Sequence, residues 1–169
     1  MAISNAPPQP ARRLVLGRAW PAHYDPWREL VQNWPGVDVV VEPMTGDLLG
    51  ELRNGGRLIA LRAGTSAAQR RCTLAHELVH LRRGVRECGP WSAREEHVVH
   101  SAAARRLISL PELARALRER GGDDDPAELA ATLEVDRETL ALRLADLSPG
   151  ERAVLGRQLA GCRLLWTVA

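Results

Sequence analysis

The segment His76-Glu77-Leu78-Val79-His80 lies inside an apolar stretch that contains no proline or glycine. Such a stretch predicts a helix, and a helix places the two histidines one turn apart on the same face. Imidazoles in this arrangement can bind one divalent metal ion at about 2.0–2.1 Å, and the glutamate between them can accept a proton from water beside the metal. The motif therefore predicts a zinc-dependent hydrolase in which Glu77 is the base and one Zn²⁺ is bound per chain.

A pattern of this length can also occur by chance on a surface helix. The neighbouring residues argue against that reading, because the motif is preceded by Thr73, Leu74 and Ala75 and followed by Leu81. A helix that is apolar on so many sides is expected to be buried, and buried imidazoles without a partner are costly. A bound metal ion explains both histidines. Two imidazoles and a carboxylate suit zinc and do not exclude manganese or iron.

A catalytic zinc ion usually has three protein ligands, so a third histidine, glutamate or aspartate is expected nearby. Residues 94–100, with the sequence REEHVVH, offer four candidates. Glu96 and His100 are four residues apart and share a helix face, and we expect Glu96 to be the third ligand. His100 is then expected to orient a ligand histidine, or to bind the metal in place of Glu96. Glu95 and His97 are weaker candidates that we expect on an exposed face.

The sequence offers candidates for further roles in the site without assigning them. His23, Tyr24 and His97 are candidates for a second electrophile beside the metal, although packing or surface exposure explains each of them equally well. Cys72 lies one turn before the motif and is expected to be a buried thiol that behaves as a small apolar residue, not a redox sensor. No residue is assigned to substrate binding, but the edge of a strand over 57–61 could pair with an extended substrate.

The segments around the motif predict an α+β fold. Apolar runs separated by the turn Asn54-Gly55-Gly56 predict a small, largely antiparallel sheet packed on a zincin-type helical core. We expect strands over 37–41, 48–53 and 57–61, and helices over about 25–33, from 65 or 66 to 84, over 92–108 and from 111 onward.

A hinge and domain boundary are predicted at 121–126, where GGDDDP combines two helix breakers with like charges. Residues 127–147 beyond it have the rhythm of a helix-turn-helix, which suggests a competing function: a non-catalytic zinc-binding protein, or a transcriptional regulator that binds DNA or protein. The second helix of the pair carries three acidic residues, Asp136, Glu138 and Asp146, against two arginines, Arg137 and Arg143, so DNA binding is possible but not favoured. The expected organisation is a flexible Pro-rich arm (1–19), a zincin-like domain (20–120) and a C-terminal helical unit (121–169).

Composition limits the remaining possibilities. A net charge of +2 over 169 residues is too small to indicate nucleic-acid binding by electrostatics alone. The three cysteines lack CxxC spacing, and the chain contains no run of about 18 apolar residues. We therefore expect a cytoplasmic protein that does not associate with membranes.

Three stretches resemble the ImmA/IrrE family of zinc metallopeptidases, which occur in actinobacterial phages and mobile elements. They are RCTLAHELVHLRRG (71–84), Glu96-x-x-Val99-His100, and AAARRLISLPEL (102–113), within a similarity that covers about residues 57–147. In the wider gluzincin group a ligand glutamate lies four residues before an acid or amide that supports a ligand histidine. Carried over, this resemblance implies His76, His80 and Glu96 as ligands, with His100 at the position of the acid or amide. It also implies a protein substrate, often a helix-turn-helix repressor.

Overall fold

A computed structural model describes residues 23–84, 93–120 and 125–159. The arm expected over 1–19 lies outside the described residues, as do residues 121–124 of the expected hinge. The described elements are α1 (Pro26–Asn33), β1 (Asp38–Glu42), β2 (Gly50–Arg53), β3 (Leu58–Arg62), α2 (Ala67–Arg82), α3 (Ala93–Leu107), α4 (Leu110–Glu119), α5 (Pro126–Thr132), α6 (Arg137–Ala145) and α7 (Pro149–Gln158). The α+β class is confirmed.

The three strands form a mixed sheet in the order β1-β3-β2. β2 and β3 are antiparallel, as predicted from the turn between them, but β1 and β3 are parallel. The prediction of a largely antiparallel sheet was therefore wrong for one of the two pairings. β3 takes the central position because it is the most apolar strand, with Ile59, Ala60 and Leu61 each fully buried at 0% exposure. Consequently the strand over 57–61 has no edge for a substrate, and the outer edges belong to β1 and β2.

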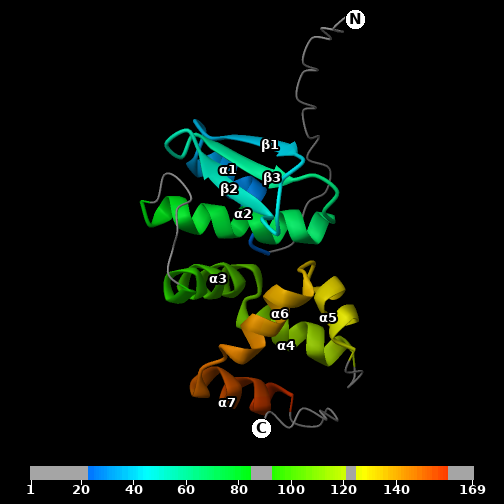
Figure 1. Ribbon diagram of the computed structural model, residues 1–169. Helices are drawn as coiled ribbons and strands as arrows, with labels where there is room; N and C mark the ends of the chain where they lie inside the picture. The colour runs from blue at the N-terminus through cyan, green and yellow to red at the C-terminus, as the bar shows by residue number, and fades with distance from the viewer. Residues whose placement is uncertain (1–22, 85–92, 121–124, 160–169) are drawn as a thin grey trace, which may run out of the picture.

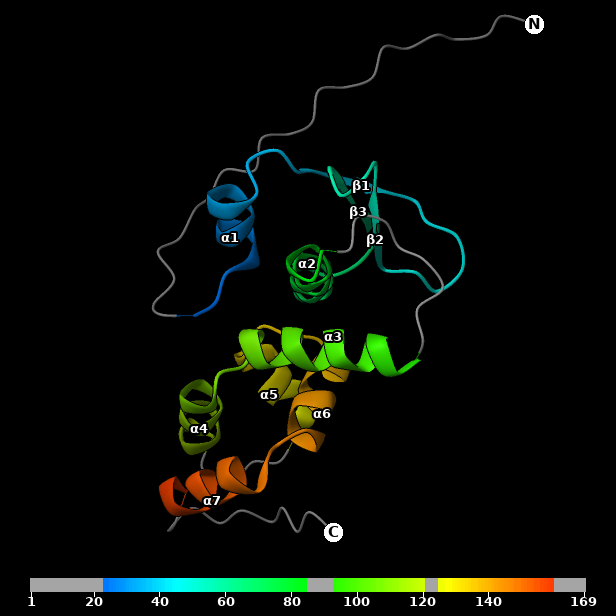
Figure 2. The ribbon, with the colours of Figure 1, turned by 90° about the vertical axis from the view of Figure 1, so that its left-hand side faces the viewer.

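α2 lies in the middle of the molecule, with α1 and the sheet on one side and α3 on the other (Figures 1 and 2). Its residues Leu74 and Leu78 pack with the sheet and α1 in one hydrophobic core. Its residues Cys72, Ala75 and Val79 belong to a second core that includes α3 and the helices after it. A helix buried on two faces must be apolar nearly all round, which explains the sequence around HELVH.

The second core continues across the expected boundary at 121. It contains Ala103 and Leu113 from one side and Leu129 and Leu140 from the other. α5 and α6 do form a short helix pair, and α6 packs along α3. The division into 20–120 and 121–169 thus remains a prediction, and the described parts on both sides share one core. No helix in the described part is long and apolar enough to cross a membrane.

A buried carboxylate on α1 links this helix to α2, which carries the HELVH motif, and to α3. Glu29 on α1 is only 6% exposed; it accepts a 2.7 Å hydrogen bond from Nε of Arg82 on α2 and pairs with Arg106 on α3. The Arg106 guanidinium also lies 4.4 Å over the Tyr24 ring. Burial acts to raise the pKa of Glu29, but the hydrogen bond from Arg82 and the charge of Arg106 outweigh it, so the pKa lies below its ordinary value.

We expect Glu29→Gln to lower the free energy of unfolding by about 1–3 kcal/mol at pH 7, because two guanidinium groups lose their anionic partner. Since the folded-state pKa of Glu29 is lowered, its contribution is fully present above the ordinary value of 4.5 and is lost as pH falls through the folded-state pKa. Urea unfolding at pH 7 and in steps below pH 4.5 measures this: the gap between wild type and variant should shrink in acid.

The matched control is Glu119→Gln, which removes the carboxylate of an exposed pair with Arg115 on α4. It should change the free energy of unfolding by less than about 0.5 kcal/mol at either pH. An equal effect of the two substitutions would contradict the role given to Glu29.

Candidate metal centre

Local sequence positions the motif on α2. Ser66 and Gln69 form a capping box, in which each side chain accepts a hydrogen bond from the backbone N–H of the other, at 3.1 and 3.0 Å. The helix ends at Arg82, and Gly84 follows with a positive φ of 81°. The predicted helix over the motif is thus present, and its two histidines lie one turn apart.

The histidines of α2 converge with Glu96 of α3. The Nε2 atoms of His76 and His80 are 3.0 Å apart. The carboxylate oxygens of Glu96 lie 3.4 Å from Nε2 of His76 and 3.5 Å from Nε2 of His80. Atoms bound to one tetrahedral ion at 2.0–2.1 Å lie about 3.4 Å from one another. The three groups therefore match a divalent metal ion in both donor chemistry and spacing.

The protonation states of the two histidines also suit metal binding. Burial, helped by the charges of His100 and His80, lowers the pKa of His76 to about 3. Burial likewise lowers the pKa of His80, which is only 3% exposed. Both imidazoles are therefore neutral at pH 7 with a nitrogen lone pair available for a metal ion. Glu77 is 2% exposed on the same helix.

His100 belongs to the same cluster. Its ring centroid lies 4.2 Å from that of His76, with 41° between the ring planes. One ligand atom from each of His76, Glu96 and His100 lies within 4.8 Å of the others. Two overlapping groups of three candidate ligands are therefore present, and they share His76 and Glu96. The other two candidates from the sequence, Glu95 and His97, are exposed.

A cavity of about 680 Å³ opens beside the cluster. One wall is the loop that leads into β2, with Asp47, and another is the first half of α6, with Asp136 and Glu138. No arginine lines this cavity within the described part of the chain, although the protein is rich in arginine. Sequence reasoning missed both walls, because no local pattern shows which distant segment packs beside a motif.

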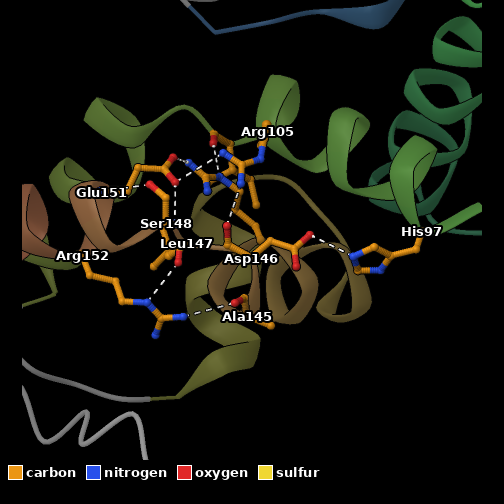
Figure 3. Close-up of polar contacts among 10 residues, drawn as sticks. His97, Arg105, Ala145, Asp146, Leu147, Ser148, Glu151 and Arg152 are labelled. Atoms are coloured by element: carbon orange, nitrogen blue, oxygen red, sulfur yellow. Dashed lines mark hydrogen bonds and ion pairs between the residues drawn. The ribbon is translucent and has the colours of Figure 1, made fainter. Parts of the chain in front are cut away.

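Of the three candidates for a second electrophile, only His97 lines this cavity, and it faces Asp146, the residue directly after α6, at 3.6 Å (Figure 3). His23 and Tyr24 line a different cavity, between α1 and the α5–α6 turn. The structure therefore does not bring those two residues to the candidate centre. Cys72 is a buried thiol, as expected, and burial raises its pKa to about 11.

Polar contacts fix α6 against α3 and α7. Arg105 donates a 2.7 Å hydrogen bond to the backbone oxygen of Asp146 and pairs with Glu151 at 3.3 Å (Figure 3). Arg143 of α6 is 2% exposed; it donates to the backbone oxygen of Ile108 at 3.0 Å and to Glu151 at 2.6 Å. The hydrogen bond from Arg143 lowers the pKa of Glu151 to about 2. Arg143 thus holds helices together and is not available to contact DNA.

Neutral histidines one turn apart, a crossing glutamate and a second glutamate between the histidines are the features of an HExxH metallopeptidase. The family profile described as the IrrE N-terminal-like domain, of peptidase family M78, matches residues 34–145, and the chain belongs to this family. The expected ImmA/IrrE relationship is confirmed, and the protein is a metallopeptidase that hydrolyses peptide bonds. Neither the comparison with curated proteins nor that with solved structures gives a match.

Proposed function

We propose that this protein is a zinc-dependent endopeptidase in which His76, His80 and Glu96 hold one Zn²⁺ and Glu77 is the general base. The observation that carries the proposal is the convergence of two imidazole nitrogens and a carboxylate at 3.0–3.5 Å. This donor set suits zinc, and manganese or iron would satisfy it as well.

A bound zinc ion would polarise the substrate carbonyl and make a water molecule more acidic. Glu77 lies between the two proposed ligand histidines in sequence, on a helix that is buried along most of its second half. Its carboxylate would accept the proton of the attacking water and then donate it to the leaving amine. Glu77 is 2% exposed and lines the cavity beside the histidines, which supports this role.

The edge of β2 is the surface on which we expect an extended substrate to bind. β2 pairs with β3 on one side, and its first residue, Gly50, lines the cavity. A Cβ atom at Gly50 would lie 2.4 Å from Cγ2 of Thr73 on α2, so glycine allows this edge to lie close to the motif-bearing helix. Strand addition there would place a peptide backbone along the cavity.

The family resemblance implies that the substrate is a regulatory protein, and we propose a helix-turn-helix repressor of a phage or mobile element, cleaved in the cytoplasm. The alternative role as a DNA-binding regulator has less support. α6, which would be the recognition helix, packs along α3 and forms a wall of the cavity with Asp136, Glu138 and Thr139. A helix in that position cannot also enter a DNA groove with the same face.

The test of the function is cleavage of a peptide library, with the new termini identified by mass spectrometry. The zinc-loaded protein should cleave peptides, a chelator should stop the reaction, and added zinc should restore it. Metal binding without any cleavage would contradict the endopeptidase proposal and favour a binding role.

The acidic walls of the cavity lead to a prediction about sequence preference. We expect cleaved peptides to be enriched in arginine or lysine near the scissile bond, because Asp47, Asp136 and Glu138 line the cavity without any arginine among its described residues. The double variant Asp47→Asn, Glu138→Gln should lower kcat/KM for a basic peptide by roughly threefold to tenfold, since exposed charges contribute about 0.2–1 kcal/mol each. The effect should weaken at high salt.

The control for this prediction is Asp38→Asn, which removes an exposed charge on β1, a strand that does not line the cavity. It should leave kcat/KM unchanged for both basic and neutral peptides. An equal loss for basic and neutral peptides in the double variant would show that the two acids do not select charge.

A further inference from the structure

His100 lies one turn after Glu96 on α3 and faces the same cluster. Its ring is 4.2 Å from that of His76, closer than the 4.6 Å between the rings of His76 and His80. Three imidazoles and a carboxylate therefore lie close together, in two overlapping groups that share His76 and Glu96. A catalytic zinc site needs three protein ligands, so this cluster offers one more than the reaction requires.

The contacts do not support an orienting role for His100. A histidine that binds metal through Nε2 is usually fixed by a hydrogen bond from its Nδ1. Nδ1 of His76 is buried and has no hydrogen-bond partner among the described residues. The His100 ring instead lies against the His76 ring at an angle of 41°. The His100 ring thus lies next to the other candidate ligands and makes no hydrogen bond to Nδ1 of His76.

We propose that His100 is a fourth protein ligand in the resting, metal-loaded protein, in addition to His76, His80 and Glu96. The inference rests on the proposed function, because it requires a metal ion at this centre. The ligand atoms of His76, Glu96 and His100 already lie within 4.8 Å of one another. Bound to one ion they would be about 3.4 Å apart, a difference that rotation of one side chain can cover.

A fourth protein ligand would close the site. Zinc bound by four protein groups is typical of structural sites, whereas catalytic sites keep one position for water or substrate. His100 is exposed, whereas His80 is buried, so His100 is the ligand that can leave most easily. The resting protein would then be latent, and a substrate or inhibitor would have to displace His100 before it reached the metal.

X-ray absorption spectroscopy of the zinc-loaded full chain can count the imidazole ligands directly. We expect three imidazoles per zinc in wild type and two in His100→Asn, with zinc still near one per chain in both. His100→Ala is a second variant that should also give two. His97→Asn is the matched control, because His97 is exposed on the same helix outside the cluster, and it should keep three.

A second measurement tests displacement on the cobalt-substituted protein. Acetohydroxamate, a small metal-binding inhibitor, should bind His100→Asn about tenfold more tightly than wild type if His100 occupies the open position about 90% of the time. Two imidazoles in wild type, with no gain in hydroxamate affinity in the variant, would overturn this inference and leave the proposed peptidase intact. Absence of metal in wild type would overturn both.

Discussion

The His76→Ala and Glu96→Ala variants should each lose the zinc that the wild type holds at about one ion per chain. Each substitution removes one donor from the group that converges at 3.0–3.5 Å. Zinc bound by a full set of protein ligands is held by about 10–16 kcal/mol, so one ligand contributes roughly 3 kcal/mol and its loss weakens binding more than a hundredfold. Elemental analysis after dialysis against a zinc buffer would measure this.

The control is His97→Ala, which removes an exposed histidine from the same helix as Glu96 and should keep a full complement of zinc. Thermal unfolding adds a second readout, because a ligand at a thousand times its Kd stabilises the folded state by about 4 kcal/mol. Wild type should show that gain with added zinc, and the two ligand variants should not. Equal zinc content in wild type and both variants would refute the ligand assignment.

The Glu77→Gln variant should bind zinc normally and yet hydrolyse peptides about 10²–10⁴-fold more slowly in kcat, with little change in KM. Glutamine has nearly the same shape as glutamate, but it cannot accept the proton of the attacking water. Glu77 is buried on the helix that carries both proposed ligand histidines, so zinc retained in the variant would show that this helix is intact. A lower kcat would then report the loss of the base.

Glu119→Gln, an exposed substitution on α4, should leave hydrolysis unchanged and serves as the control for the same chemical change. Zinc content must be measured in parallel, so that lost metal is not mistaken for lost catalysis. Full activity in Glu77→Gln with zinc bound would rule out this residue as the base and leave the metal site without an assigned proton acceptor.

Much of the centre follows from local patterns along the chain. HELVH places its two histidines on one face of any helix that it forms, and Ser66 with Gln69 begins that helix through short-range hydrogen bonds. Glu96 and His100 were found in the same way, by their spacing on a second helix. These interactions depend only on residues within one or two helical turns.

The order of the strands could not be obtained from such patterns. Each strand was recognised, but the parallel pairing of β1 with β3 depends on which strand is buried on both sides. Ile59, Ala60 and Leu61 are all apolar, and their burial between α2 and the neighbouring strands outweighs the simpler antiparallel meander. The strand order therefore depends on the free energy of the complete fold, which no single segment determines.

The candidate centre and the cavity around it differ in the same way, because local spacing determines the first and long-range packing determines the second. The proposed ligand residues and the proposed base are recognisable in the sequence because their spacing must match a helical turn. The cavity walls at Asp47 and Glu138, and the burial of Arg143, arise because α6 packs on α3 and the loop before β2 folds over the motif. Long-range burial of apolar surface positions these segments, and that free energy depends on the completed core, not on local spacing.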